Sequence, residues 1–257
     1  MADSQGKVII LTGASRGIGL AISHYLLTHH HKLVVLARTH SALDQLHYQY
    51  PEQVEVLAGD LSDFSFGAKA VEVAISRWGK LDAVIVNHGV LDPVKKVANT
   101  DVEEWRKAFD INVFSGISLI QTALPYIRTS KGRIILTSSG AAINAYTGWG
   151  AYGAGKAVFN HLALTLAIEE PDVTTISVRP GVVDTEMQRE IREKHNIAMD
   201  AKDAEKFRSL KEGGSLLRPE QPGHVIAKLA VEDGVGKELS GKFLNWNDDV
   251  LKAFQEK

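Results

Sequence analysis

Two residues that could share a proton-transfer role, Tyr152 and Lys156, stand four positions apart in the sequence. Small and apolar residues around them recur at helical spacing, and residues four apart lie on the same face of a helix. A positive charge about 4 Å from a phenol, at an effective dielectric of about 20, lowers the phenol pKa by roughly three units. The pair could therefore act as an acid–base group near neutral pH.

The spacing alone is weak evidence, because chance gives about 0.4 Tyr-x-x-x-Lys pairs in a chain of this composition. The stretch from Ser138 to Lys156 reads SSGAAINAYTGWGAYGAGK and follows a β-branched run. A strand is thus expected to end where the stretch begins, and a helix to carry the Tyr–Lys pair. Whether the pair is catalytic depends on whether the rest of the chain supplies a redox cofactor.

The composition is that of an ordinary globular protein of 257 residues, with 44% hydrophobic and 23% charged residues. A net charge of −2 gives no electrostatic reason to expect nucleic acid or a membrane surface as partner. Cysteine is absent, which excludes a disulfide framework, and we expect no metal. The polar start, MADSQGK, and the lack of an apolar run of about 20 residues predict neither a targeting peptide nor a membrane span. A cytoplasmic enzyme is expected.

Seven short apolar runs rich in β-branched residues alternate with segments of helical periodicity. These predicted strands span residues 7–12, 32–37, 54–58, 81–87, 132–138, 174–179 and 242–246. The alternation predicts an α/β fold: a single Rossmann-type, doubly wound domain over residues 1–257, with a seven-stranded, mostly parallel sheet and helices on both faces. Thr100 and Glu103 predict a capping box that opens a long helix carrying Asn112.

A glycine-rich loop connects the first predicted strand to the first predicted helix. Its Gly13, Gly17 and Gly19 follow the pattern G-x-x-x-G-x-G, and glycines let the backbone turn tightly and approach a diphosphate. The helix N-terminus adds unpaired N–H groups and a positive dipole end. The order strand, loop, helix favours a dinucleotide site over a merely tight turn.

The end of the second predicted strand carries Arg38 and Thr39 and no acidic residue. In dinucleotide folds this position meets the adenosine ribose, where a carboxylate suits a 2′-hydroxyl and an arginine suits a 2′-phosphate. Arg16 lies nearby in the glycine loop. The two arginines predict NADPH rather than NADH; the alternative is that both are solvated surface residues.

Further motifs follow in order along the chain. They are Gly-Asp-Leu at 59–61, Asn-His-Gly at 87–89, Asn112, Ser139 thirteen residues before Tyr152, and Pro-Gly-Val-Val-Asp-Thr at 180–185. Together with the glycine loop and the Tyr–Lys pair, they resemble the short-chain dehydrogenase/reductase family in its single-domain form, over nearly the whole chain. His88 departs from the family pattern Asn-Asn-Ala-Gly.

The resemblance implies an NADP cofactor, held along the carboxyl edge of the sheet. Asp60 would contact the adenine, Asn87 would support the central sheet near the ribose, and residues 180–185 would hold the nicotinamide carboxamide. The residues expected to contact the cofactor are Gly13, Ser15, Arg16, Gly17, Ile18, Gly19, Arg38, Thr39, Asp60, Leu61, Asn87, Gly89, Tyr152, Lys156, Pro180, Gly181, Val183 and Thr185.

The resemblance also implies a mechanism in which hydride passes to a carbonyl carbon. Tyr152 would donate a proton to the developing alkoxide, and Ser139, rather than its neighbour Ser138, would hydrogen-bond the same oxygen. Lys156 would bind the nicotinamide ribose and lower the Tyr152 pKa. Asn112 would hold a water that resupplies the proton.

A weaker resemblance links the stretches 217–221 and 240–248 to the sepiapterin reductase and benzil reductase subgroup. It implies that the small-molecule substrate is a vicinal diketone or a pterin side-chain ketone. Residues 143–149 are expected to line the pocket. Candidate substrate contacts are Trp149, Tyr146, Met187 and Val90, with Asp248 as a candidate polar anchor. The alternative for each apolar residue is plain packing, and for Asp248 a surface position.

Residues 185–219 are charged and weakly apolar, and they follow the sixth strand at the edge where ligands bind in open α/β sheets. We interpret them as a mobile substrate lid; an ordinary pair of surface helices is the alternative.

The favoured function is an NADPH-dependent carbonyl reductase. An NAD-dependent alcohol or hydroxysteroid dehydrogenase and a non-catalytic cofactor-sensing regulator are the competing hypotheses. The family often dimerises through the helices that here contain Asn112 and Tyr152, so a homodimer is expected, with a tetramer as the alternative.

Overall fold

A single sheet runs through the computed structural model, which describes residues 6–256. Its strands are β1 (Val8–Thr12), β2 (Lys32–Ala37), β3 (Val54–Ala58), β4 (Ala83–Val86), β5 (Arg133–Thr137), β6 (Thr174–Arg179) and β7 (Phe243–Asn245). They lie in the order β3-β2-β1-β4-β5-β6-β7, and each neighbouring pair is parallel. The predicted Rossmann-type α/β fold is confirmed, and the sheet is wholly rather than mostly parallel.

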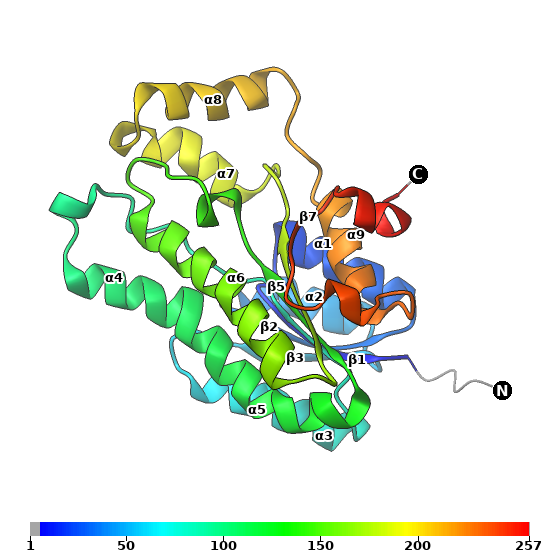
Figure 1. The fold of residues 1–257 in the computed structure, drawn as a ribbon. Coiled ribbons are helices and arrows are strands. Elements are labelled where there is room, and N and C mark those ends of the chain that lie inside the picture. The colour runs from blue at the N-terminus through cyan, green and yellow to red at the C-terminus, as the bar shows by residue number, and fades with distance from the viewer. Residues whose placement is uncertain (1–5, 257) are drawn as a thin grey trace.

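Helices cover both faces of this sheet (Figure 1). One face packs against α1 (Gly17–Thr28), α2 (His40–Gln49) and α9 (Glu220–Val231), and the other against α3 (Ser65–Trp78), α5 (Ser115–Ser130) and α6 (Gly150–Glu169). The remaining helices are α4 (Val102–Phe109), α7 (Glu186–Glu190) and α8 (Ala201–Glu212). Because each crossover helix returns the chain to the same edge, the loops after the strands gather at one edge of the sheet.

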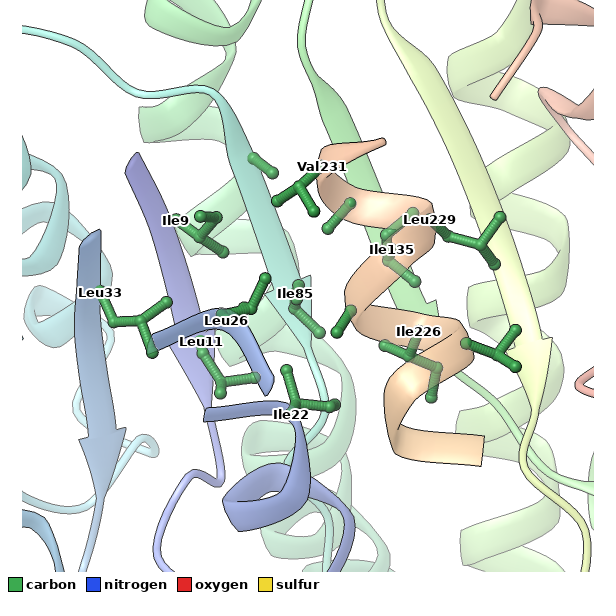
Figure 2. Packing of buried hydrophobic residues seen from close by; sticks show 14 of the residues in the cluster. Ile9, Leu11, Ile22, Leu26, Leu33, Ile85, Ile135, Ile226, Leu229 and Val231 are labelled. Carbon is green, nitrogen blue, oxygen red and sulfur yellow. The ribbon is translucent and has the colours of Figure 1, made fainter. Parts of the chain in front are cut away.

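The strands are apolar at nearly every position because both faces are buried. In β1, Ile9 and Leu11 belong to the core on one face, while Val8 and Ile10 belong to the core on the other. Figure 2 shows the first of these cores, with Ile226 of α9 among its members. Full burial of one such side chain stabilises the fold by about 1.5–3 kcal/mol, so the two cores stabilise the sheet that carries the loops at its carboxyl edge.

The predicted elements differ from the observed ones mainly at their ends. The first, fourth, fifth and seventh strands are one to three residues shorter than expected at one or both ends. The capping box at α4 was predicted one residue early. Asp101, not Thr100, is the N-cap: its carboxylate accepts a hydrogen bond from the Glu103 N–H at 2.9 Å, and the Glu104 carboxylate accepts one from the Asp101 N–H at 3.1 Å. The Thr100 hydroxyl instead donates to the Lys96 carbonyl at 2.9 Å.

The long helix expected to carry Asn112 is interrupted. Between α4 and α5 the chain makes a π-helical turn, Asp110–Phe114, and Asn112 lies in its middle, 1% exposed. Such single turns widen a helix and release backbone groups from the regular ladder. This turn therefore places side chains and carbonyls next to β4 that a continuous α-helix would direct elsewhere.

Residues 186–212 of the predicted lid segment are almost entirely helical, and residues 213–219 lead on to α9. α7 continues into a π-helical turn (Ile191–His195) and a 3-10 turn (Asn196–Ala198), and α8 follows. Figure 1 shows α7 and α8 standing beyond the carboxyl edge of the sheet. None of the helices in residues 6–256 combines the length and apolar character that crossing a membrane requires.

Candidate active site

A cavity of about 540 Å³ opens at the carboxyl edge of the sheet. It is lined by the loops that follow the first six strands and by the start of α6. The structure brings into its wall every predicted cofactor residue: Gly13, Ser15, Arg16, Gly17, Ile18, Gly19, Arg38, Thr39, Asp60, Leu61, Asn87, Gly89, Tyr152, Lys156, Pro180, Gly181, Val183 and Thr185. Ser139 lines it too, whereas Asn112 and Asp248 do not.

The glycine loop is shaped as a close-fitting cradle. Gly13 and Gly17 have φ values of +68° and +54°, which side chains rarely tolerate. A Cβ on Gly19 would lie 2.0 Å from the Gly13 carbonyl oxygen, so the first turn of α1 is packed directly on the loop. Arg16, the N-cap of α1, makes no side-chain cap bond, which leaves backbone N–H groups at this end of the helix. The loop fits a diphosphate.

The loop after β2 places Arg38 and Thr39 in the cavity wall, and Arg38 and Arg16 also line one further cavity together. In the part of the chain that the structure describes, neither guanidinium has a carboxylate within 4.0 Å. Thr39 is the N-cap of α2, and its hydroxyl makes no cap bond. These groups form a cationic end of the cavity, where the arginine N–H groups and the Thr39 hydroxyl can donate hydrogen bonds to a ligand.

The Tyr–Lys pair is buried at the centre of the cavity, with Tyr152 8% and Lys156 3% exposed. Burial raises the pKa of Tyr152, and the Ser139 hydroxyl opposes this rise. Burial lowers the pKa of Lys156 to about 8. The Lys156 Nζ donates to the Thr137 carbonyl at 2.7 Å and lies 5.9 Å from the centroid of the Tyr152 ring. Contrary to the prediction, the pKa of Tyr152 lies above its ordinary value in this structure, and burial is the main cause.

The two serines after β5 face different partners. Ser138 is 2% exposed and directs its hydroxyl toward the Lys156 carbonyl, at 3.4 Å. The Ser139 hydroxyl accepts a hydrogen bond from the Ala141 N–H at 3.1 Å and acts on the phenol of Tyr152. Ser139 is thus the serine placed beside the tyrosine, as expected.

Asn112 fixes the loop after β4. Its Oδ1 accepts from the Val90 N–H and its Nδ2 donates to the Val90 carbonyl, both at 2.8 Å. These bonds leave a second N–H and a second oxygen lone pair on the amide, and the expected water on this side chain stays a prediction. The clamp also brings Gly89 close to Lys156: a Cβ on Gly89 would lie 3.5 Å from the Lys156 Nζ.

His88 is a site residue to which the sequence assigned no role. Its Nδ1 lies 2.7 Å from the Thr12 hydroxyl, and its Nε2 lies 2.8 Å from both the Ile111 carbonyl and the Ser115 hydroxyl. A carbonyl can only accept, so Nε2 carries the proton and Nδ1 accepts from Thr12. Burial, and to a lesser degree the nearby Lys156 charge, lowers the His88 pKa to about 4. A neutral imidazole therefore ties β1 and β4 to the π-helical turn.

The apolar end of the cavity is built from aromatic residues on two segments. Trp149 stacks on Phe207 of α8, with ring centroids 5.5 Å apart and planes 15° apart, and Tyr146 lies 4.8 Å from Trp149. Met187 also lines this end, as does Val90. Phe207 was not expected, because only the tertiary fold brings α8 over the stretch before α6.

Two expectations about substrate contacts are corrected. Ile143 is 63% exposed and lies outside the cavity wall, so the segment 143–149 contributes only Tyr146 and Trp149. Asp248 does not reach the cavity, because its carboxylate is used in a turn. It accepts from the Asn245 backbone N–H at 2.8 Å and from the Asn245 amide at 3.0 Å.

Comparisons with known proteins agree with this site. A profile of the short chain dehydrogenase family matches residues 7–196. An uncharacterised oxidoreductase of Schizosaccharomyces pombe is 40% identical over 97% of this chain and 100% of its own length. The (S)-benzoin-forming benzil reductase of Saccharomyces cerevisiae is 38% identical, over 97% of this chain and 99% of its own. A crystal structure of a short-chain dehydrogenase/reductase from S. cerevisiae superposes with a TM-score of 0.95 at 40% identity, covering 98% of this chain and 100% of that one.

The chain belongs to the short-chain dehydrogenase/reductase family. It is therefore an oxidoreductase that uses a nicotinamide cofactor and acts on a small molecule.

Proposed function

We propose that this chain is an NADPH-dependent carbonyl reductase that acts on a ketone or a 1,2-diketone. The observation that carries the proposal is the cavity in which Ser139, Tyr152 and Lys156 meet beside the glycine loop. Arg16 and Arg38, with no acid after β2, favour NADPH over NADH. The likeness to a benzil reductase supports a diketone.

The chemistry follows from where the polar groups lie. When bound, the nicotinamide supplies a hydride to the carbonyl carbon. Tyr152 donates its phenolic proton to the carbonyl oxygen as negative charge develops there, and the Ser139 hydroxyl donates a hydrogen bond to the same oxygen. Lys156 binds the nicotinamide ribose, while burial raises the Tyr152 pKa and so keeps the phenol protonated and able to donate. Asn112 clamps the loop at Val90, beside Lys156, and would hold the water that resupplies the proton.

Tyr152→Phe tests the proposal, since it keeps the ring and removes only the hydroxyl. We expect NADPH binding to persist while kcat for benzil falls by at least about 100-fold. Tyr48→Phe, at a tyrosine 88% exposed on α2, is the matched control and should retain full activity. Benzil reduction undiminished in Tyr152→Phe would contradict Tyr152 as the acid. A wild-type protein that binds NADPH but reduces no carbonyl compound would instead favour the regulator.

A further inference from the structure

Arg179 is a cation in the cavity wall to which the proposed chemistry gives no role. It is the last residue of β6, and its Nη1 donates to Asn245 Oδ1 on β7 at 3.3 Å. Asn245 is itself held by the two hydrogen bonds to Asp248 described above. The turn at 245–248, where the sequence suggested a substrate anchor at Asp248, thus serves as the anchor of this arginine.

The guanidinium lies against Gly140, the residue that follows Ser139. A Cβ on Gly140 would lie 2.9 Å from Nε, 2.9 Å from Nη2 and 3.0 Å from Cζ. These nearly equal distances place Gly140 over the face of the guanidinium rather than at its edge. The Nε and Nη2 hydrogens point outward in the guanidinium plane, where they can donate to oxygen acceptors. Any side chain at position 140 would displace the group.

Within residues 6–256 the Asn245 amide is the side-chain partner of Arg179, and no carboxylate lies within 4.0 Å of it. A guanidinium presents five N–H donors and recognises paired or adjacent oxygen acceptors through its planar fork. Gly140, which the guanidinium contacts, directly follows the serine that would contact the reacting carbonyl oxygen, and both Arg179 and Ser139 line the cavity.

We propose that Arg179 binds the second oxygen of the substrate, so that the enzyme selects carbonyl compounds with an oxygen acceptor next to the reacting carbonyl. This inference rests on the proposed function and names its substrate class. The acceptor is a ketone oxygen in a 1,2-diketone or a carboxylate in a 2-oxo acid. The aromatic wall of Tyr146, Trp149 and Phe207 suits an aryl substituent on either.

Benzil and deoxybenzoin test the proposal, because both carry two phenyl rings and deoxybenzoin has a methylene in place of the second carbonyl. In Arg179→Gln we expect kcat/KM for benzil to fall about tenfold or more, as for loss of a hydrogen bond to a charged group, and that for deoxybenzoin to change less than about twofold. Equal losses on both ketones would overturn the proposal and leave Arg179 as a support for the Ser139 loop.

Benzoylformate distinguishes the two kinds of acceptor. If kcat/KM for benzoylformate falls more in Arg179→Gln than kcat/KM for benzil, and is partly restored in Arg179→Lys, the carboxylate is the preferred group. If it falls less, the diketone is the preferred group. Arg77→Gln is the matched control, since Arg77 lies on α3, pairs with Glu52 at 3.0 Å and does not line the cavity. Arg77→Gln should leave kcat/KM unchanged for benzil, deoxybenzoin and benzoylformate.

Two further measurements keep the test decisive. If Arg179→Gln does not fold, Asn245→Ala removes the anchor instead and should produce the same selective loss of kcat/KM for benzil; a uniform loss for both ketones would overturn the proposal.

Calorimetric binding of benzil and deoxybenzoin to Tyr152→Phe with NADP⁺, with and without Arg179→Gln, needs no turnover. A benzil-specific loss of affinity would support Arg179 even if reduction, and with it the proposed function, failed; no such loss would overturn it.

Discussion

Burial acts in the same sense on Tyr152 and Lys156, because it favours the neutral form of each group. The Tyr152 pKa is raised, and the Lys156 pKa is lowered to about 8. Lys156 is therefore largely charged at pH 7 and loses its charge as the pH rises through about 8. A phenol in this setting serves better as a proton donor than as a base, which agrees with the reductive direction that we propose.

Arg38 should determine which cofactor is preferred. Arg38→Ala removes the cation at the end of β2, so we expect KM for NADPH to rise about tenfold or more and KM for NADH to change little. Initial rates with each cofactor at saturating benzil measure both values. Arg106→Ala, at an arginine of α4 outside the cavity wall, is the control. An equal rise in KM for the two cofactors would contradict the proposal that Arg38 binds the 2′-phosphate of NADPH.

His88 should make the fold sensitive to acid. Its pKa is about 4 in the folded chain and about 6.5 when unfolded, so the unfolded state binds more protons between these values. The free energy of unfolding therefore falls as the pH drops from 6.5 to 4, by on the order of 3 kcal/mol. His88→Asn removes the titrating group, and we expect a shallower fall in urea unfolding measured at pH 7.0, 5.5 and 4.5.

His31 provides the comparison for that experiment. Burial is also the main cause that lowers its pKa, to about 4, and it lies at the opposite end of the sheet from the cavity. His31→Asn should flatten the same acid slope without changing kcat. His88→Asn should in addition change kcat, since it loosens the π-helical turn beside Lys156. An undiminished acid slope in His88→Asn would show that the imidazole titrates normally in the fold.

At the scale of elements, the capping box of α4 gives a direct test of the N-cap. Asp101→Ala removes the carboxylate that accepts from Glu103, and we expect about 1 kcal/mol loss in the free energy of unfolding. Thr100→Ala removes only a bond to the Lys96 carbonyl and should cost less. Urea unfolding of both variants at pH 7 compares them. A larger loss in Thr100→Ala would restore Thr100 as the cap.

Residues 185–219 are held over the cavity by contacts that could open together. Thr147 donates to Asp200 at 2.6 Å, Lys206 donates to the Tyr146 hydroxyl at 3.0 Å, and Lys211 pairs with Asp184 at 2.8 Å. All three contacts are exposed, and exposed pairs contribute little stability. We propose that this segment moves as a lid on a single domain, with Met187, Ile191 and Phe207 as its apolar contacts to the site.

The sequence could predict those parts of the structure that local pattern decides. Buried β-branched runs, the glycine loop and the Tyr–Lys spacing each act within a few residues, and they located the sheet and residues that line the cavity at its carboxyl edge. Contacts between distant segments could not be read in this way. Arg179 meets Asn245 across 66 residues, and Phe207 meets Trp149 only because α8 folds back. The tautomer of His88 likewise depends on a carbonyl in a π-helical turn, which no short motif indicates.

At the scale of the whole molecule, apolar side chains remain exposed on the face that α5 and α6 cover. Leu164 and Ile168 of α6 are 54% and 82% exposed, and Tyr126 of α5 is 40% exposed. We propose that this face forms a homodimer. Light scattering of the wild type should give a molar mass of twice the 28.0 kDa chain mass. The double variant Leu164→Glu, Ile168→Glu should give the mass of a single chain. Ile197→Glu, at a residue 91% exposed next to α8, is the control. A monomeric wild type would contradict the proposal.

The stack of Trp149 on Phe207 has a practical consequence for watching the enzyme at work. The chain has four tryptophans, and Trp149 is the one whose ring lies on α8 in the part of the chain that the structure describes. Its indole N–H is buried without a hydrogen-bond partner, so its emission depends on whether this environment stays dry. Each opening of the segment would wet the indole and shift its fluorescence to longer wavelength. The fluorescence of Trp149 should therefore report opening of residues 185–219, and with it access to the active site.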